Sequence, residues 1–133
     1  MLARLYKFFP VLAFIALAGC ASGPTAQDIA SADYGSVIQQ DDAESQIKSY
    51  FNRALKDPES ARYGFSTVEK GHVIGNSFQG SPLYVGYIVY AKVNAKNSYG
   101  GYTGDKGYLF LFQNGRLAKG QEITPRGNAI DLF

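Results

Sequence analysis

The hydrophobic pattern of this chain changes its period once, near Tyr63, and this change restricts the folds that the chain can form. Before Tyr63, apolar residues recur at intervals of three and four, which is the period of a helix with one buried face. After Tyr63, they recur at every second residue, which is the period of a strand. The sequence therefore predicts a helix followed by a sheet.

The predicted helix lies within residues 41–56. Its apolar stripe is formed by residues that share one face, namely Ile47, Tyr50, Phe51, Ala54 and Leu55. Asp41 or Asp42 can cap the N-terminus of this helix. The helix is expected to end before Pro58, because a residue that precedes proline avoids the helical region.

The strands are expected between Tyr63 and Ile123. Residues 63–75 predict one or two short strands with a break near Gly71, and residues 83–93 alternate most clearly. Residues 108–113 form a nearly continuous apolar run, which is typical of a central strand. Asn114 and Gly115 predict a tight hairpin turn into the last strand.

Together these elements predict one α+β domain over residues 41–124. The apolar stripe of the N-terminal amphipathic helix would pack on a small antiparallel sheet of three to five strands, in two layers. Residues 125–133 are expected to form a loose C-terminal tail, and residues 20–40, which are small and polar, are expected to form a flexible tether.

The first residues, MLARLYKFFPVLAFIALAGC, have the pattern of a secretory signal peptide. Arg4 and Lys7 form a basic head, and an apolar run follows from Phe8 to Ala18. This run is too short to cross a bilayer, which needs about 20 apolar residues.

The stretch LAGC, which ends at Cys20, resembles the lipobox of bacterial lipoprotein precursors. The resemblance implies a signal peptide over residues 1–19, a diacylglycerol on the sulfur of Cys20, and a membrane anchor formed by acyl chains at the new N-terminus. Ala21 follows the cysteine, and by resemblance to known sorting in Gram-negative bacteria this favours the outer membrane, with the domain facing the periplasm. A plain signal peptide that contains a cysteine, or a signal anchor, is the alternative interpretation.

Cysteine content and charge exclude several classes of protein. Cys20 is the only cysteine, so no disulfide can form within one chain and the fold must rest on its core. The formal charge of +2 comes entirely from Arg4 and Lys7 in the expected signal peptide. The rest of the chain is balanced and has no basic stripe, so we expect no nucleic-acid partner.

Residues 93–104, VNAKNSYGGYTG, form the most distinctive motif. Together with LKDPESARY before them and YLFLF and NG after them, they resemble an uncharacterised domain that recurs in small proteobacterial hypothetical proteins and lipoproteins. The resemblance covers roughly residues 45–118. Relatives often carry a cysteine in the strand before the motif, whereas this chain reads VGYIVYAKV there. The resemblance implies a fold and no mechanism.

The motif also supplies the candidate recognition residues, which are Asn94, Lys96, Asn97, Tyr99, Gly100, Gly101, Tyr102 and Gly104. In one interpretation the glycines and asparagines shape a turn, and the tyrosines pack over the sheet edge. In the other, the tyrosines offer amphipathic contact surface and the asparagines offer hydrogen bonds to a ligand.

No pattern in the sequence indicates catalysis, a metal or a cofactor. His72 is the only histidine, whereas zinc needs three or four ligands. No nucleophile elbow, phosphate-binding loop or facing pair of carboxylates is evident. The sequence therefore predicts a non-enzymatic, lipid-anchored envelope lipoprotein whose domain binds another envelope protein. A glycan-binding or hydrolase-inhibitor module that uses the Tyr99–Tyr102 loop is the alternative.

Overall fold

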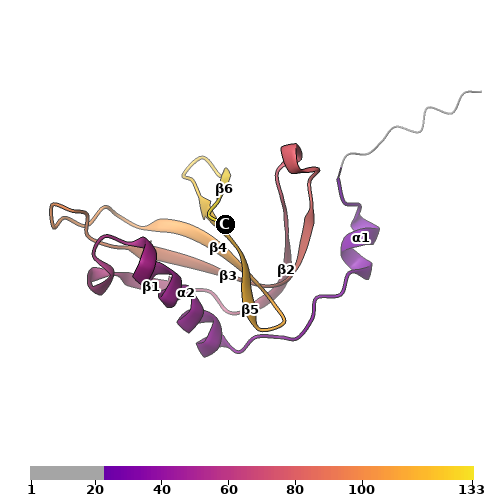
Figure 1. Cartoon of the computed structure of the whole chain (residues 1–133), viewed down its shortest axis with the longest axis horizontal. Coiled ribbons are helices and arrows are strands. Elements are labelled where there is room, and N and C mark those ends of the chain that lie inside the picture. The colour runs from indigo at the N-terminus through magenta and orange to yellow at the C-terminus, as the bar shows by residue number, and fades with distance from the viewer. Residues whose placement is uncertain (1–22) are drawn as a thin grey trace, which may run out of the picture.

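A computed structural model describes residues 23–133, so Cys20 and the expected signal peptide lie outside the described residues. Figure 1 shows the elements, which follow one another in the order α1 (Ala26–Ser31), α2 (Gln40–Ala54), η1 (Pro58–Ser60), β1 (Arg62–Phe65), β2 (Glu69–Ile74), η2 (Ser77–Gln79), β3 (Leu83–Asn94), β4 (Lys106–Gln113), β5 (Arg116–Ile123) and β6 (Ala129–Asp131). The chain is therefore α+β, as its hydrophobic periods predict.

The six strands form one antiparallel sheet in the order β1-β3-β4-β5-β6, and β2 also pairs with β3. β3 is 12 residues long and has two partners along the same edge. β1 pairs with its last residues, 91–94, and β2 pairs with its first, 83–88. Residues 66–68 connect β1 to β2. There the Ser66 hydroxyl accepts a hydrogen bond from the backbone N–H of Tyr90 at 2.9 Å, which holds this connection against β3.

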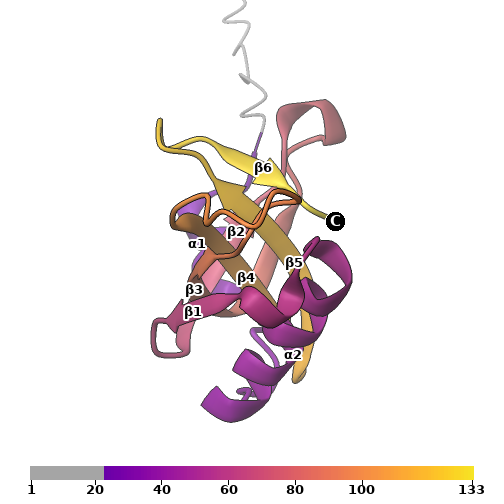
Figure 2. The same cartoon turned by 90° about the vertical axis from the view of Figure 1, so that its left-hand side faces the viewer.

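Helix α2 covers one face of this sheet (Figure 2). Its buried residues are Ala43, Ile47 and Phe51, and they pack with β3 and β4. The Phe51 ring meets the Tyr108 ring edge-on, with centroids 4.9 Å apart. Burying an aromatic or branched side chain of this size stabilises a fold by about 1.5–3 kcal/mol. The stability of the fold therefore depends on this core, because a chain with one cysteine has no internal disulfide.

The expected number of three to five strands is wrong, because the sheet has six. The interruption in residues 63–75 lies at residues 66–68, and Gly71 sits inside β2, opposite Gly86. Two separate strands therefore form where the alternation favoured one or two. The sixth strand comes from the C-terminal residues.

The expectation of a loose tail over residues 125–133 is also wrong, since β6 pairs with β5. A tight turn returns the chain, with the Thr124 N–H donating to the Asn128 carbonyl at 2.8 Å. Lys119 and Asp131 form an ion pair at 3.4 Å across the two strands. The Phe133 ring then reaches Tyr50 of α2, with centroids 5.3 Å apart.

The described part of the expected tether, residues 23–40, is also structured. Helix α1 begins with a reciprocal cap between Thr25 and Asp28. Ile38 is buried in the core beneath α2. The side chain of Gln40 donates to the Ser66 carbonyl and accepts from the Val68 N–H. The globular domain therefore begins before residue 41.

Candidate functional site

The motif loop, defined here as residues 95–105, connects β3 to β4 and is shaped by its own asparagines. The side-chain oxygen Oδ1 of Asn97 accepts from the backbone N–H groups of Tyr99 at 2.9 Å and Gly101 at 3.2 Å. Asn94 likewise accepts from the Gly104 N–H at 3.2 Å. These two carbonyl oxygens stabilise the loop, which is the structural interpretation of the motif.

Tyr102 folds back onto the segment before β1. Its hydroxyl donates to the Ser60 carbonyl at 3.1 Å, and the Arg62 guanidinium lies 4.3 Å from its ring centroid. The Lys96 ammonium lies 5.5 Å from the same centroid, and Lys96 pairs with Tyr102 in a single β-bridge. Contacts between a cation and an aromatic face stabilise by about 0.5–1 kcal/mol at exposed positions. Tyr102 therefore anchors the loop.

Tyr99 differs from Tyr102, because its side chain is 97 % exposed at the loop tip. Gly100 and Gly104 adopt positive φ angles of 82° and 91°, which turn the chain on either side of Tyr102. Among the tyrosines of the motif, Tyr99 alone is free to meet a ligand with its whole ring. The loop thus brings the predicted residues together and leaves the ring of Tyr99 almost fully exposed.

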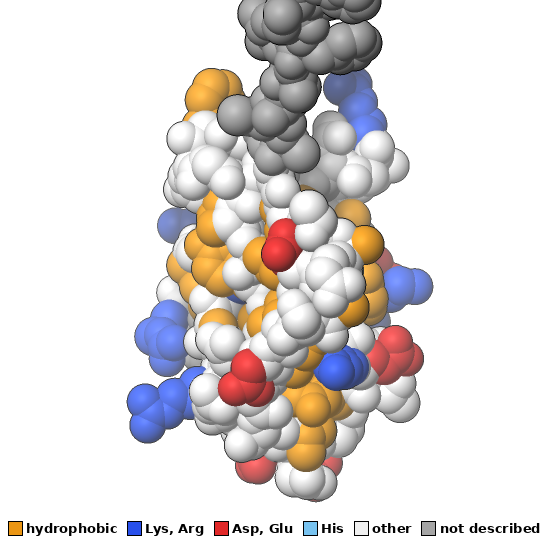
Figure 3. Space-filling model, turned by 90° about the vertical axis from the view of Figure 1, so that its right-hand side faces the viewer, with side chains coloured by type: hydrophobic (Ala, Val, Ile, Leu, Met, Phe, Trp, Pro, Cys, Tyr) orange, Lys and Arg blue, Asp and Glu red, His pale blue; other side chains and the backbone are white. Residues whose placement is uncertain are grey.

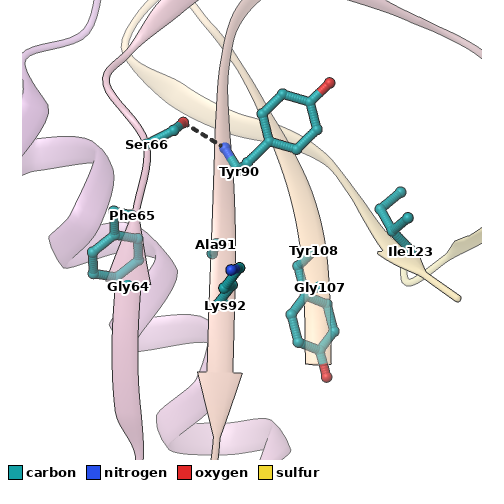
Figure 4. Close-up of a pocket in the computed structure, with 9 residues that line it drawn as sticks. All are labelled: Gly64, Phe65, Ser66, Tyr90, Ala91, Lys92, Gly107, Tyr108 and Ile123. Carbon is teal, nitrogen blue, oxygen red and sulfur yellow. Dashed lines mark hydrogen bonds between the residues drawn. The ribbon is translucent and has the colours of Figure 1, made fainter. Parts of the chain in front are cut away.

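A second candidate lies on the sheet face opposite α2. Here a row of residues crosses four strands in register, from Gly64 through Lys92 and Gly107 to Ile123. We define the sheet groove by this row and Tyr90, which borders it (Figure 4). Its cavity volume is about 470 Å³. Because side chains alternate along β3, Tyr90 and Lys92 project away from α2 whereas Ala91 faces it.

The groove exists because two of its floor residues have no side chain. A Cβ on Gly64 would lie 3.9 Å from the Lys92 Cβ, and a Cβ on Gly107 would lie 3.7 Å from the Ile123 carbonyl oxygen. Both distances are ordinary van der Waals contacts, so the backbone tolerates larger residues there. Gly64 and Gly107 therefore leave open space that the fold does not require.

Apolar walls and unpaired cations give the groove its chemical character. Tyr90 is 52 % exposed. Beyond it, a cluster of Val73, Leu109 and Leu111 continues on the same face. Arg62 and Lys92 are both exposed on this face, and neither forms an ion pair within residues 23–133. The arrangement suits an apolar group that carries a negative charge.

The described residues show no arrangement for metal binding. Within residues 23–133, no group of three His, Cys, Asp or Glu side chains could hold an ion. His72 lies on β2 opposite Val85. Among the helices of this same part of the chain, none has the length and apolar character that a membrane crossing requires.

The sequence analysis missed the sheet groove. The available signal was glycine inside a strand, which marks a place where a side chain is missing from one face. That signal cannot show that Gly64 and Gly107 flank the same lysine, because pairing register depends on residues far apart in the chain. In comparisons with known proteins, no family model, no curated protein and no solved structure matches this chain.

Proposed function

We propose that this chain is a non-enzymatic lipoprotein of the Gram-negative cell envelope. In this proposal Cys20 carries the acyl chains that anchor the protein to the outer membrane. The α+β domain, which contains the motif VNAKNSYGGYTG, faces the periplasm. The support is the lipobox LAGC after a basic head and a short apolar run. The domain would act there by binding another envelope protein.

The observation that carries the binding role is the sheet groove. It is largely apolar and lies on a sheet face that α2 does not cover. Lys92 lines it and offers positive charge, and Arg62, whose guanidinium contacts the Tyr102 ring, lies two residues from Gly64 on the same strand. The occupant that fits is an extended segment of a partner protein with an apolar side chain next to Asp or Glu. The apolar group would fill the space above Gly64 and Gly107, and the carboxylate would meet the cations.

Photo-cross-linking in cells tests this binding role. A photoreactive amino acid in place of Tyr90 is expected to capture a partner, and the same amino acid in place of Asn52, exposed on α2, is expected to capture none. Gly64→Val fills the groove and Lys92→Glu reverses its charge, so both should reduce capture several-fold. Lys56→Glu, an equal charge change at an exposed position outside the groove, should leave capture unchanged.

Mass spectrometry of the captured segment completes the test. An apolar residue beside Asp or Glu is the expected sequence. Capture that survives Gly64→Val, or recovery of the monomer alone, would contradict the binding role.

The lipid anchor has its own test. Mass spectrometry of the purified protein should find Cys20 as the first residue, with a diacylglycerol and an acyl group attached, and Cys20→Ser should abolish both the lipid and the cleavage. A chain that retains residues 1–19, or a free thiol on a soluble product, would refute the anchor.

A second function, as a glycan-binding or hydrolase-inhibitor module, is favoured by the exposed ring of Tyr99. Pull-down with peptidoglycan fragments and a lysozyme inhibition assay test it. Tyr99→Ala is the clean variant, because Tyr102→Ala also removes the contacts with Ser60 and Arg62. Signals that survive Tyr99→Ala would eliminate the loop as the binding site.

A further inference from the structure

The hairpin between β2 and β3 ends in a tip, defined as residues 75–82, which carries a fully exposed aromatic ring. Phe78 is fully exposed on the short helix η2. The tip contains no charged residue. A phenylalanine ring that leaves water contributes about 1.5–3 kcal/mol, so this exposed ring would gain that free energy if an apolar environment lay next to it.

The tip is an ordered turn that holds this ring outward. The Asn76 side chain accepts from the Gln79 N–H at 3.0 Å. The Gly75 N–H donates to the Pro82 carbonyl at 2.8 Å, which closes the base of the turn. Gly80 has a φ of 80°, a conformation that glycine adopts without strain. Phe78 therefore stands on a preformed turn.

The hairpin tip lies beside the first described residue. A Cβ placed on Gly23 would be 4.0 Å from the Ser81 Cβ. Cys20 precedes Gly23 by three residues, which span at most about 11 Å when fully extended. An acyl anchor on Cys20 would thus be attached within about 11 Å of Gly23, the residue that lies beside the hairpin tip. The surface nearest to the tip would then be the bilayer that holds the anchor.

The turn between β5 and β6 lies at the same end of the molecule. Figures 1 and 2 show this turn, the hairpin and the start of the described chain all directed the same way, away from α2. Arg126 is exposed in this turn, and it forms no ion pair in the part of the chain that the structure describes. Figure 3 shows a hydrophobic and a basic side chain at this upper end, whereas the acidic side chains and the other basic ones lie lower down.

We propose that the hairpin tip is a membrane-contacting wedge. Phe78 enters the interfacial region of the bilayer in which the acyl chains of Cys20 are held, and Arg126 meets anionic lipid head groups beside it. This proposal rests on the lipid anchor of the proposed function. A second fixed contact would give the domain one orientation on the membrane, with α2 directed away from the bilayer.

Tryptophan fluorescence tests the wedge, because the chain contains no tryptophan. The lipidated Phe78→Trp protein is placed in vesicles of phosphatidylethanolamine and phosphatidylglycerol, with and without brominated lipids. The matched control is Tyr99→Trp, at the other nearly fully exposed aromatic position. The Phe78→Trp emission is expected to shift to the blue and to be quenched by brominated lipid several-fold more than that of Tyr99→Trp. Arg126→Glu in the Phe78→Trp protein should reduce this quenching.

The outcomes separate the two proposals when mass spectrometry of the same preparation confirms the lipid. If the Phe78→Trp protein is lipidated but is quenched by aqueous iodide as strongly as Tyr99→Trp, the wedge is refuted and the anchor stands. A preparation that carries no lipid on Cys20 overturns both. Quenching by brominated lipid at position 78 alone supports the wedge.

Discussion

At the scale of single residues, glycines determine where the backbones of neighbouring strands come unusually close and where the surface of the sheet has free space. Gly64 and Gly107 leave room above them, whereas Gly86 has none: a Cβ there would lie 2.1 Å from the Phe112 carbonyl oxygen. The pairing of β4 with β5 shifts register between Leu111 and Phe112, close to this contact. The same residue type therefore leaves the surface open at one place and permits a close backbone approach at another.

Replacing Gly86 should be costly. Because the Cβ of Gly86→Ala would overlap backbone, we expect the free energy of unfolding to fall by about 1–3 kcal/mol. Urea denaturation measures it. Gly64→Ala, whose Cβ meets only ordinary contacts, should stay within about 0.5 kcal/mol of the parent. Equal losses in the two variants would show that the close approach at Gly86 is absent.

Removing the hydroxyl of Tyr63, unlike replacing Gly86, should not lower the stability of the fold. This hydroxyl is buried and has no hydrogen-bond partner within residues 23–133, and burial raises the pKa of Tyr63. Tyr63→Phe removes an unsatisfied polar group while the ring still stacks against Phe65, so the free energy of unfolding should stay the same or rise by about 1 kcal/mol. A clear loss of stability in thermal unfolding would mean that the hydroxyl is satisfied in solution.

At the scale of elements, side-chain contacts hold the short C-terminal strand. β6 has three residues, too few for backbone pairing alone to hold it firmly. Asp131 accepts from the Gln121 amide at 2.9 Å and pairs with Lys119, which is buried beside the Tyr84 ring. The hydrogen bond from Gln121, together with the charge of Lys119, lowers the pKa of Asp131 despite its partial burial.

Asp131→Asn should therefore release β6. The variant leaves the Lys119 ammonium buried without its carboxylate, which we expect to cost about 1–3 kcal/mol. Hydrogen exchange should show faster exchange of the Leu132 N–H, which donates to the Gly120 carbonyl at 2.9 Å. Asp105→Asn, at an exposed loop position, is the control and should change neither quantity. Retained protection at Leu132 would contradict this role of the ion pair.

At the scale of the whole molecule, the core between α2 and the sheet couples stability to alkaline pH. Burial, with smaller contributions from the charge of Glu122 and from the nearby Tyr50, raises the pKa of Tyr108 to about 12. An unfolded tyrosine titrates near pH 10. The stability from keeping Tyr108 neutral is therefore fully present below pH 10 and is lost as the pH rises to about 12.

Tyr108→Phe should remove this pH dependence. Between pH 10 and about 12 the parent protein should lose up to about 2 kcal/mol more unfolding free energy than the variant does. Denaturant unfolding at several pH values measures the difference. Tyr99→Phe, at the exposed loop tip, should follow the parent curve. Parallel curves for Tyr108→Phe and the parent would place the alkaline sensitivity elsewhere.

The sequence alone determined the local elements of the described chain. The stripe through Ile47 and Phe51 specified α2, alternation specified β3, and Asn114-Gly115 specified a turn in which both residues have positive φ, 51° and 74°. These features depend on neighbours within a few residues, which is why pattern and turn chemistry predict them.

Only the tertiary structure decided which distant residues meet. The alignment of Gly64 with Gly107 across Lys92 depends on the register of β1, β3 and β4, which no local pattern encodes. The same holds for the pairing of β6, for the folding back of Tyr102 and for the position of Gly23 beside Ser81. Register and docking are selected by the free energy of the whole packed molecule, and so the groove and the hairpin tip became visible only in three dimensions.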